Sequence, residues 1–389
     1  MKLPIYLDYH ATTPCDPRVV EAMLPCFRER FGNPSSRSHS FGREAEEMVE
    51  RGRRQVADLL GASPEEVVFT SCATEANNLA LKGAACARRE AGDGEHIVSA
   101  RIEHKSVLEP LATLEEEGFR ITWLDVDETG RVDPADVADA MDDGTILVSL
   151  MLANNEIGTI EPLAEVAAIA HAAGAWVHTD AVQAIGKLPV RVDELDVDLL
   201  ALSGHKFYGP KGIGALYVRR RERRMKLAPS LCGGGQERGL RSGTHNVPGI
   251  VGLGVAAAVA EEERVAESAR LAVLRDRLQD GLQREIEDLI VNGDPANRLP
   301  NNLSVSIPWV DGEALLLSLE DIAVSSGSAC RSSAPGGSHV MKAIGLNDDL
   351  ARSTVRFGLG RWTTEEEIDY AIGRVTETVA RLRSMSSLT

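Results

Sequence analysis

The chain has 389 residues, of which 43% are hydrophobic and 26% charged, and this ordinary composition excludes a disordered or fibrous protein. Its 42 basic and 59 acidic residues give a net charge of −17, which repels phosphate backbones, so we expect no nucleic-acid partner. The sequence contains neither a membrane-length apolar stretch nor a secretory signal at its start, so we expect a cytoplasmic protein without a membrane anchor. The six cysteines form no C-x-x-C pair, and no histidine cluster has zinc spacing, so we expect neither a disulfide scaffold nor a metal site.

Strand-like and helical patterns alternate through the first two thirds of the chain. Short strands are predicted at 66–69, 96–99, 120–124, 145–150, 175–178 and 199–202. Alanine-rich helical patterns, such as 161–173, separate most of them. This alternation predicts a largely parallel α/β sheet covered on both faces, to which 213–218 adds one more strand, parallel or antiparallel.

The alternation of strand-like and helical patterns stops after residue 249. A long helical stretch, 249–289, precedes a strand at 302–307, a helix, a Gly/Ser-rich loop, a strand at 353–357 and a closing helix from 364. We therefore predict a large α/β domain over 15–260 and a smaller α+β domain made of 1–14 and 261–389.

Three segments carry residues suited to one ligand. The segment 70–76 follows a strand and opens a helix, which makes an anion site for a phosphate, or else an ordinary helix start capped by Thr74. Asp180 ends a predicted strand, where ligands gather in α/β sheets, and it either caps a helix or holds a positive charge on a ligand. Lys206 follows an apolar strand, where burial would make it a nucleophilic amine, unless it is a surface-turn lysine. Pyridoxal 5′-phosphate needs all three features together, so we predict this cofactor.

The chain is similar to a known family over nearly its whole length. The matching motifs are YLDYHATTP at 6–14, GNPSS at 32–36, TSCATEANN at 70–78, EHK at 103–105, NNEIG at 154–158, SGHKFYGPKGIG at 203–214, RSGT at 241–244, SSGSAC at 325–330 and VRF at 355–357. They resemble the NifS/IscS-type cysteine desulfurases of the class V aminotransferase family. The resemblance implies an α/β fold of the aspartate-aminotransferase type (fold type I of pyridoxal-phosphate transferases), in a homodimer.

The resemblance also implies a role for each matching residue. Lys206 holds the cofactor, His104 stacks on its ring and assists proton transfer, Asp180 faces the ring nitrogen, and Gln183 donates to the ring oxygen. Ala73, Thr74, Ser203 and His205 cradle the phosphate, together with Thr244 from the neighbouring subunit. Asn155 lies near the ring oxygen and the substrate, Arg356 binds the substrate carboxylate, and Cys330 takes the sulfur.

The implied activity is removal of sulfur from L-cysteine, which gives L-alanine and a persulfide on Cys330. Small and hydroxyl residues surround Cys330 in 325–337, and Arg331 favours its thiolate. A selenocysteine lyase or an aminotransferase on the same scaffold is the nearest alternative, and a non-catalytic sulfur carrier is a further one. The sulfur acceptor, an iron–sulfur scaffold or a thiolation protein, is left open.

Two residues depart from the family pattern. Cys72 stands where the family usually has glycine, and we expect it to be a spectator beside the phosphate cradle. His10 occupies a variable position of the opening motif, and the resemblance gives it no role.

Overall fold

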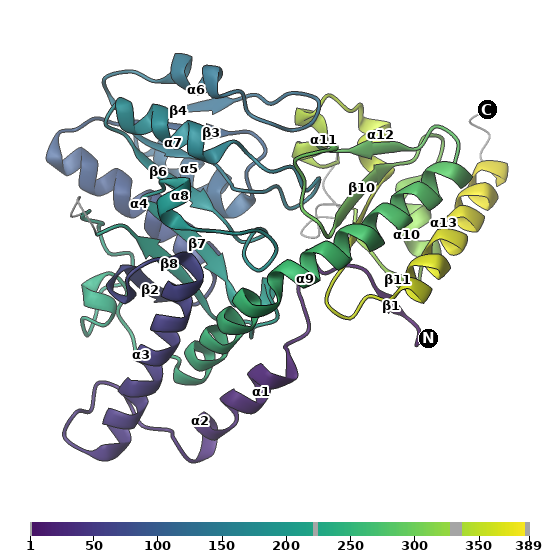
Figure 1. Ribbon diagram of the computed structural model, residues 1–389. Helices are drawn as coiled ribbons and strands as arrows, with labels where there is room; N and C mark the ends of the chain where they lie inside the picture. The colour runs from purple at the N-terminus through teal and green to yellow at the C-terminus, as the bar shows by residue number, and fades with distance from the viewer. Residues whose placement is uncertain (1, 221–224, 327–336, 386–389) are drawn as a thin grey trace.

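The computed structural model describes residues 2–220, 225–326 and 337–385. Its largest element is a seven-stranded sheet (Figure 1). The strand order is β2 (Val67–Thr70), β8 (Gly214–Val218), β7 (Leu199–Ser203), β6 (Trp176–Asp180), β5 (Thr145–Ser149), β3 (His96–Ala100) and β4 (Arg120–Leu124). All neighbours pair in parallel except at β8, which is antiparallel to both β2 and β7. The predicted α/β fold with a mostly parallel sheet is confirmed. The strand predicted at 213–218, whose direction the sequence left open, is antiparallel.

Helices cover both faces of this sheet because its strands are apolar on both sides. Along β7, Leu200 and Leu202 enter the core beneath one face, whereas Leu199 and Ala201 enter the core beneath the other. The first core is shared with α3 (Ser40–Leu60), α7 (Leu163–Ala172) and the first part of α9 (Val247–Glu285). The second core is shared with α4 (Ala73–Ala91) and α5 (Lys105–Glu116). The large sheet is therefore buried on both faces.

A second, smaller sheet packs on its own core. It consists of β12 (Thr354–Gly358), β10 (Asn302–Ser306) and β9 (Ile290–Asn292), which are antiparallel. The end of α9 and the helix α13 (Glu365–Met385) share its core. A separate parallel pair joins β1 (Ile5–Tyr6) to β11 (Ile322–Ala323), so the start of the chain lies against the C-terminal part. The C-terminal third therefore has the α+β structure that its sequence predicts.

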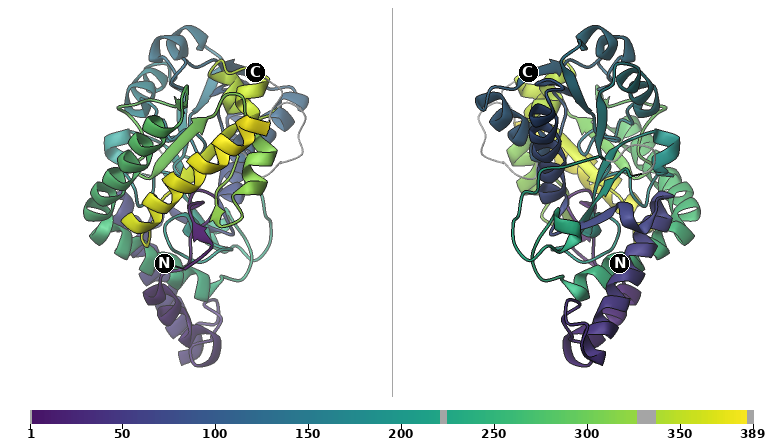
Figure 2. Two further views of the ribbon diagram at one scale, coloured as in Figure 1. Left: turned by 90° about the vertical axis from the view of Figure 1, so that its right-hand side faces the viewer. Right: turned by 90° about the vertical axis from the view of Figure 1, so that its left-hand side faces the viewer.

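The remaining helices are short. They are α1 (Pro17–Met23), α2 (Pro25–Arg28), α6 (Pro134–Ala140), α8 (Val192–Leu195), α10 (Gly312–Ser318), α11 (His339–Ala343) and α12 (Asp348–Arg352). Short 3₁₀ turns lie at Pro64–Glu66, Gly204–Lys206 and Glu237–Gly239. The end of the molecule that holds α1, α2 and the start of α3 projects from the rest (Figure 2). No helix in the described parts of the chain is long and apolar enough to cross a membrane.

The helix α9 runs from one core to the other. Its residues up to Ala260 belong to the core of the large sheet, and its residues from Leu271 onward belong to that of the small sheet. The helix begins and ends a few residues earlier than the predicted 249–289, because Asn246 caps its start by accepting from Gly249 N–H and the chain is extended at Ile286. The division into domains at residue 260 stays a prediction.

Candidate active site

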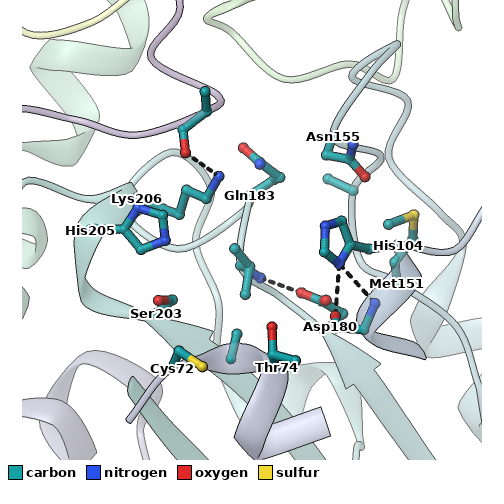
Figure 3. A pocket seen from close by; sticks show the side chains of 15 residues that line it. Cys72, Thr74, His104, Met151, Asn155, Asp180, Gln183, Ser203, His205 and Lys206 are labelled. Carbon is teal, nitrogen blue, oxygen red and sulfur yellow. Dashed lines mark hydrogen bonds between the residues drawn. The ribbon is translucent and has the colours of Figure 1, made fainter. Parts of the chain in front are cut away.

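A cavity of about 240 Å³ opens at the carboxyl ends of β6 and β7 (Figure 3). Its lining comes from six parts of the chain: the opening segment, the start of α4, the start of α5, the loop after β5, the end of β6 and the end of β7. The lining residues are Ala11, Cys72, Ala73, Thr74, His104, Ser106, Met151, Ala153, Asn155, Asp180, Val182, Gln183, Ser203, His205 and Lys206. Nine of the residues to which the sequence assigned a role are therefore brought together in one place.

The start of α4 forms one end of the cavity. Cys72 is the residue before the helix, and its side chain makes no capping hydrogen bond. Thr74 lies inside the first turn, so the alternative in which Thr74 caps the helix is wrong. A Cβ added to Gly214 on β8 would lie 2.8 Å from the Cys72 carbonyl carbon and 3.1 Å from Ala73 N. The helix start and its positive dipole can therefore approach the sheet this closely because residue 214 has no side chain.

Ser203, His205 and Lys206 follow β7 and face this helix start. The Ser203 hydroxyl is buried and has no hydrogen-bond partner in the described parts of the chain. Burial and the charges of Lys206 and Lys211 lower the pKa of His205 to about 4, so its ring is neutral. Lys206 Nζ donates to the carbonyl oxygens of His10 and of Ala11, the latter at 2.8 Å. The half-buried amine therefore points into the cavity from a 3₁₀ turn and is not a solvated surface lysine.

Asp180 is the last residue of β6, and its carboxylate is held from two sides. Val182 N–H donates to Oδ1 at 3.0 Å, and Asn77 Nδ2 donates to Oδ2 at 2.8 Å. The next helix along the chain is α8, so the alternative in which Asp180 caps a helix is wrong. His178 and Ser149 extend this network, because His178 Nε2 meets Asn77 Oδ1 at 3.1 Å and Ser149 Oγ meets His178 Nδ1 at 2.9 Å. A carboxylate only accepts, so Asn77 turns its nitrogen toward Asp180 and its oxygen toward His178.

His104 lies on the other side of the cavity from Lys206 and caps α5 (Figure 3). Ser106 N–H donates to His104 Nδ1 at 3.1 Å, so Nδ1 carries no proton and the neutral ring keeps its proton on Nε2. The Ser106 hydroxyl lies 2.8 Å from the same nitrogen and accepts from Asn77 Nδ2, also at 2.8 Å. Burial lowers the pKa of His104, against the opposing effect of the Asp180 carboxylate. The Asn77 carboxamide therefore contacts both Asp180 and Ser106, the residue that bonds to His104.

Two assigned residues of the described part of the chain do not line the cavity. Arg356 is buried on β12 and donates to the Asn155 carbonyl at 2.7 Å and to Asp8 Oδ1 at 2.9 Å, so it lies beside one lining residue. Thr244 is exposed and stands outside the cavity of its own chain. Cys330 lies outside the described residues.

Sequence reasoning missed the residues that support the cavity. Asn77, Ser106 and His10 are buried and bond to residues with assigned roles, and the buried His178 bonds to Asn77. For Asn77 a signal was present, since it is a polar residue within the buried stripe of α4 that also holds Ala73, Ala76 and Ala80. A polar side chain in an apolar stripe needs a buried partner.

Comparisons with known proteins agree on the family of this chain. Residues 5–371 match the family model described as aminotransferase class-V. The chain belongs to this family. A cysteine desulfurase IscS of Anaeromyxobacter dehalogenans is 54% identical over 388 residues, which cover 100% of this chain and 95% of that relative.

Solved structures agree with the family assignment. A protein titled NifS-like has a TM-score of 0.91 and 40% identity, and the match covers 98% of this chain and all of the other. A structure titled SspA in complex with cysteine has a TM-score of 0.81 and 38% identity, and the match covers 92% and 100% of the two chains. The resemblance to the NifS/IscS-type enzymes and the fold expected from it are confirmed.

Members of this class V family use pyridoxal phosphate, and the cavity fits that group. The Ser203 hydroxyl, which has no partner in the described chain, and the start of α4, which packs closely on Gly214, are donors suited to a phosphate. Asp180 is a buried carboxylate suited to a ring nitrogen, and Lys206 is an amine suited to an aldehyde. The donor set therefore matches the three chemical groups of the cofactor.

Proposed function

We propose that the protein is a pyridoxal-phosphate-dependent cysteine desulfurase in which Lys206 binds the cofactor and Cys330 receives sulfur from L-cysteine. The observation that carries the proposal is the cavity, which gathers Lys206, Asp180 and an unpartnered Ser203 hydroxyl at a helix start. It occurs in a chain that is 54% identical over its whole length to a cysteine desulfurase.

The chain's own residues divide the work of holding the cofactor. When bound, pyridoxal phosphate withdraws electrons from the α-carbon of an amino acid that is joined to it. Ser203 Oγ and the first N–H groups of α4 would hold the phosphate, and the Asp180 carboxylate would keep a proton on the ring nitrogen. Lys206 Nζ is the amine that joins the aldehyde, and the Gln183 amide donates to the ring oxygen.

Two further residues act on the substrate. His104 would stack on the cofactor ring, and it holds a movable proton at Nε2 because Nδ1 accepts from Ser106 N–H. The planar fork of Arg356 binds the substrate carboxylate, and its bond to the Asn155 carbonyl fixes its position next to the cavity.

The sulfur transfer balances without an added oxidant or reductant. The Cys330 thiolate attacks the sulfur of L-cysteine as the bond from that sulfur to its carbon breaks. The carbon takes a proton and leaves as L-alanine, and Cys330 keeps the sulfur as a persulfide. A thiol of an acceptor, an iron–sulfur scaffold or a thiolation protein, then removes it.

The test follows the products from one turnover. Purified chain given L-cysteine without a reductant should form one alanine and one persulfide per chain, with the added sulfur on Cys330 by mass spectrometry. Borohydride reduction should place the pyridoxyl adduct on Lys206. Cys330→Ser should keep the visible colour and form no alanine above background, because a hydroxyl is a poor nucleophile toward sulfur.

Cys232→Ser is the matched control, because Cys232 is an exposed cysteine outside the cavity. It should turn over at the wild-type rate. Alanine formation by Cys330→Ser at the wild-type rate, or a pyridoxyl adduct on Lys105 or Lys211, would contradict the assignment.

We also propose that the chain works as a homodimer in the cytoplasm. Phe27, Phe31 and Phe41 on the projecting end are 61%, 64% and 51% exposed, which is unusual for rings of this size on a free surface. Thr244 is exposed and so can reach a second chain. Light scattering should give the mass of two chains, and a monomeric mass at working concentration would contradict this.

A further inference from the structure

His10 is buried against the residue expected to bind the cofactor's ring oxygen. Its side chain is 2% exposed and belongs to the opening segment that passes beside Gln183. Two hydrogen bonds join the pair: His10 Nδ1 lies 2.9 Å from Gln183 Oε1, and Gln183 Nε2 donates to the His10 carbonyl at 3.1 Å. The same carbonyl also accepts from Lys206 Nζ.

These contacts determine where each proton sits. A backbone carbonyl only accepts, so the group of Gln183 that faces the His10 carbonyl is the NH₂. Its oxygen then faces His10 Nδ1, which must carry a proton in order to donate. His10 is therefore the Nδ1–H tautomer with a bare Nε2, and Nε2 has no partner in the described parts of the chain.

The imidazole is held in this state. Burial, with the nearby charge of Arg356, lowers the pKa of His10 to about 3, so the ring stays neutral through the physiological range. A Cβ placed on Gly358 would lie 2.8 Å from His10 Cδ2, so the strand β12 packs directly against the ring. Rotation of the ring is blocked on that side.

The remaining donor of Gln183 is directed by these bonds. Gln183 lines the cavity, and the second N–H of its Nε2 donates to no described residue. Without the imidazole, the His10 carbonyl alone would hold the carboxamide, so the amide could pivot about this one bond and direct its second N–H away from the ring oxygen.

We propose that His10 is a positioning residue that fixes the carboxamide of Gln183 with an N–H directed into the cavity, toward the ring oxygen of the cofactor. The proposal deepens the proposed function and rests on it for the identity of the ligand. The chain's departure at a variable position of its opening motif thus acts on the cofactor through Gln183.

The first test determines which ring nitrogen of His10 carries the proton, and it needs no cofactor. Long-range ¹H–¹⁵N spectra of the full chain labelled at histidine should show His10 as the Nδ1–H tautomer, unchanged from about pH 5.5 to 8. The spectrum of His10→Asn, which lacks this signal, assigns it. A proton on Nε2, or a charged His10 in this range, overturns the proposal.

The second test reads the effect on the ring oxygen. His10→Leu removes the donor, and loss of the oriented N–H should raise the pH midpoint of the visible band by about one unit, the worth of one hydrogen bond. Cofactor affinity should fall about tenfold. His10→Asn, whose amide N–H takes the place of Nδ1–H, should stay near the wild-type midpoint.

His96→Leu is the control for a generic loss of a buried imidazole. His96 is buried, bonds to Thr145 and Thr122, and lies outside the cavity. It should lose stability without moving the midpoint. An unmoved midpoint in His10→Leu, or an equal shift in His96→Leu, overturns the proposal. If the chain takes up no pyridoxal phosphate, the proposed function fails, while the histidine spectrum still decides the state of His10.

Discussion

At the scale of single residues, Asn77 connects both sides of the cavity. Its nitrogen donates to Asp180 Oδ2 and to Ser106 Oγ, which in turn contacts His104 Nδ1. Its oxygen lies against His178 Nε2. The side chain is fully buried, so none of these groups can be satisfied by bulk water if it is removed.

We expect Asn77→Ala to lower the free energy of unfolding by about 1–3 kcal/mol, because it leaves buried polar groups unpaired. Turnover should fall by about 10- to 100-fold, because Asp180 and His104 lose their alignment. Urea unfolding and steady-state kinetics measure the two effects. The control is Asn78→Ala, which removes only a bond to the Thr74 carbonyl within the helix and should leave turnover close to wild type. Equal losses in both variants would show that Asn77 has no special role.

Much of the cavity lining could be predicted from the sequence, but the residues behind the lining could not. Asp180 ends a strand, and Lys206 and the start of α4 follow strands within three residues, so local sequence pattern places all three at the carboxyl ends of strands. Asn77 and Asp180, by contrast, are 103 residues apart, and His10 and Gln183 are 173 apart. Their contact depends on strand order and on the return of the opening segment, which no local pattern specifies.

At the scale of elements, the junction of β2 and α4 depends on a glycine in the neighbouring strand. Gly214 pairs with Thr70 on one side and with Ser203 on the other. A Cβ there would lie 2.6 Å from the Leu202 carbonyl oxygen and 2.8 Å from the Cys72 carbonyl carbon. The backbone must move apart to admit it.

We expect Gly214→Ala to lower the free energy of unfolding by about 1–3 kcal/mol through overpacking, and to weaken phosphate binding at the displaced helix start. The same substitution at Gly373, in the exposed part of α13 where nothing lies within 4 Å, should be neutral or stabilising by up to about 1 kcal/mol. Urea titration and the affinity for pyridoxal phosphate check both. Unchanged stability and affinity in Gly214→Ala would contradict the close approach.

Element types were predicted more reliably than element ends. The antiparallel direction of β8 could not be read from its residues, since it depends on pairing with β2, which lies far earlier in the chain. The strand predicted to begin at Glu66 begins at Val67 in the structure, because Glu66 closes a capping box with Ser63 in a 3₁₀ turn. Such a local bond competes with strand geometry without changing the hydrophobic pattern.

At the scale of the whole molecule, buried carboxyl and imidazole groups have opposite effects on stability as the pH changes. Burial lowers the pKa of His178 to about 3, so its contribution is present above about pH 6.5 and is lost as the pH falls toward 3. Burial raises the pKa of Glu161 from 4.5 to about 8, so its contribution is present below 4.5 and is lost as the pH rises through 8. The two effects together favour an intermediate pH.

Glu161→Gln isolates one side of this balance. Glu161 accepts from Val132 N–H at 2.9 Å, and its other oxygen has no partner in the described residues. Because glutamine cannot ionise, the stability of the wild type relative to the variant should fall as the pH rises from about 5 to 8, by at most about 1.4 kcal/mol per unit. Urea unfolding at several pH values measures the difference. A difference that stays constant across this range would mean that Glu161 is ionised in the folded chain.

The pairing of β1 with β11 has a consequence for how the chain is made. Ile5 meets Ile322, and Asp8 meets Arg356, across more than 300 residues of sequence. At a synthesis rate of about 5–20 residues per second, residues 5–8 leave the ribosome roughly 15 to 60 s before their partners exist. The strands of the large sheet pair with none of these residues and can form during translation, whereas β1 and Asp8 must wait for their partners. His10 and the carbonyl groups around Lys206 belong to the same opening segment. The two ends of the opening segment are therefore fixed at different times: His10 and Thr13 can bond to Gln183 and His205 once the large sheet exists, whereas β1 is anchored only after the C-terminal third has been synthesised.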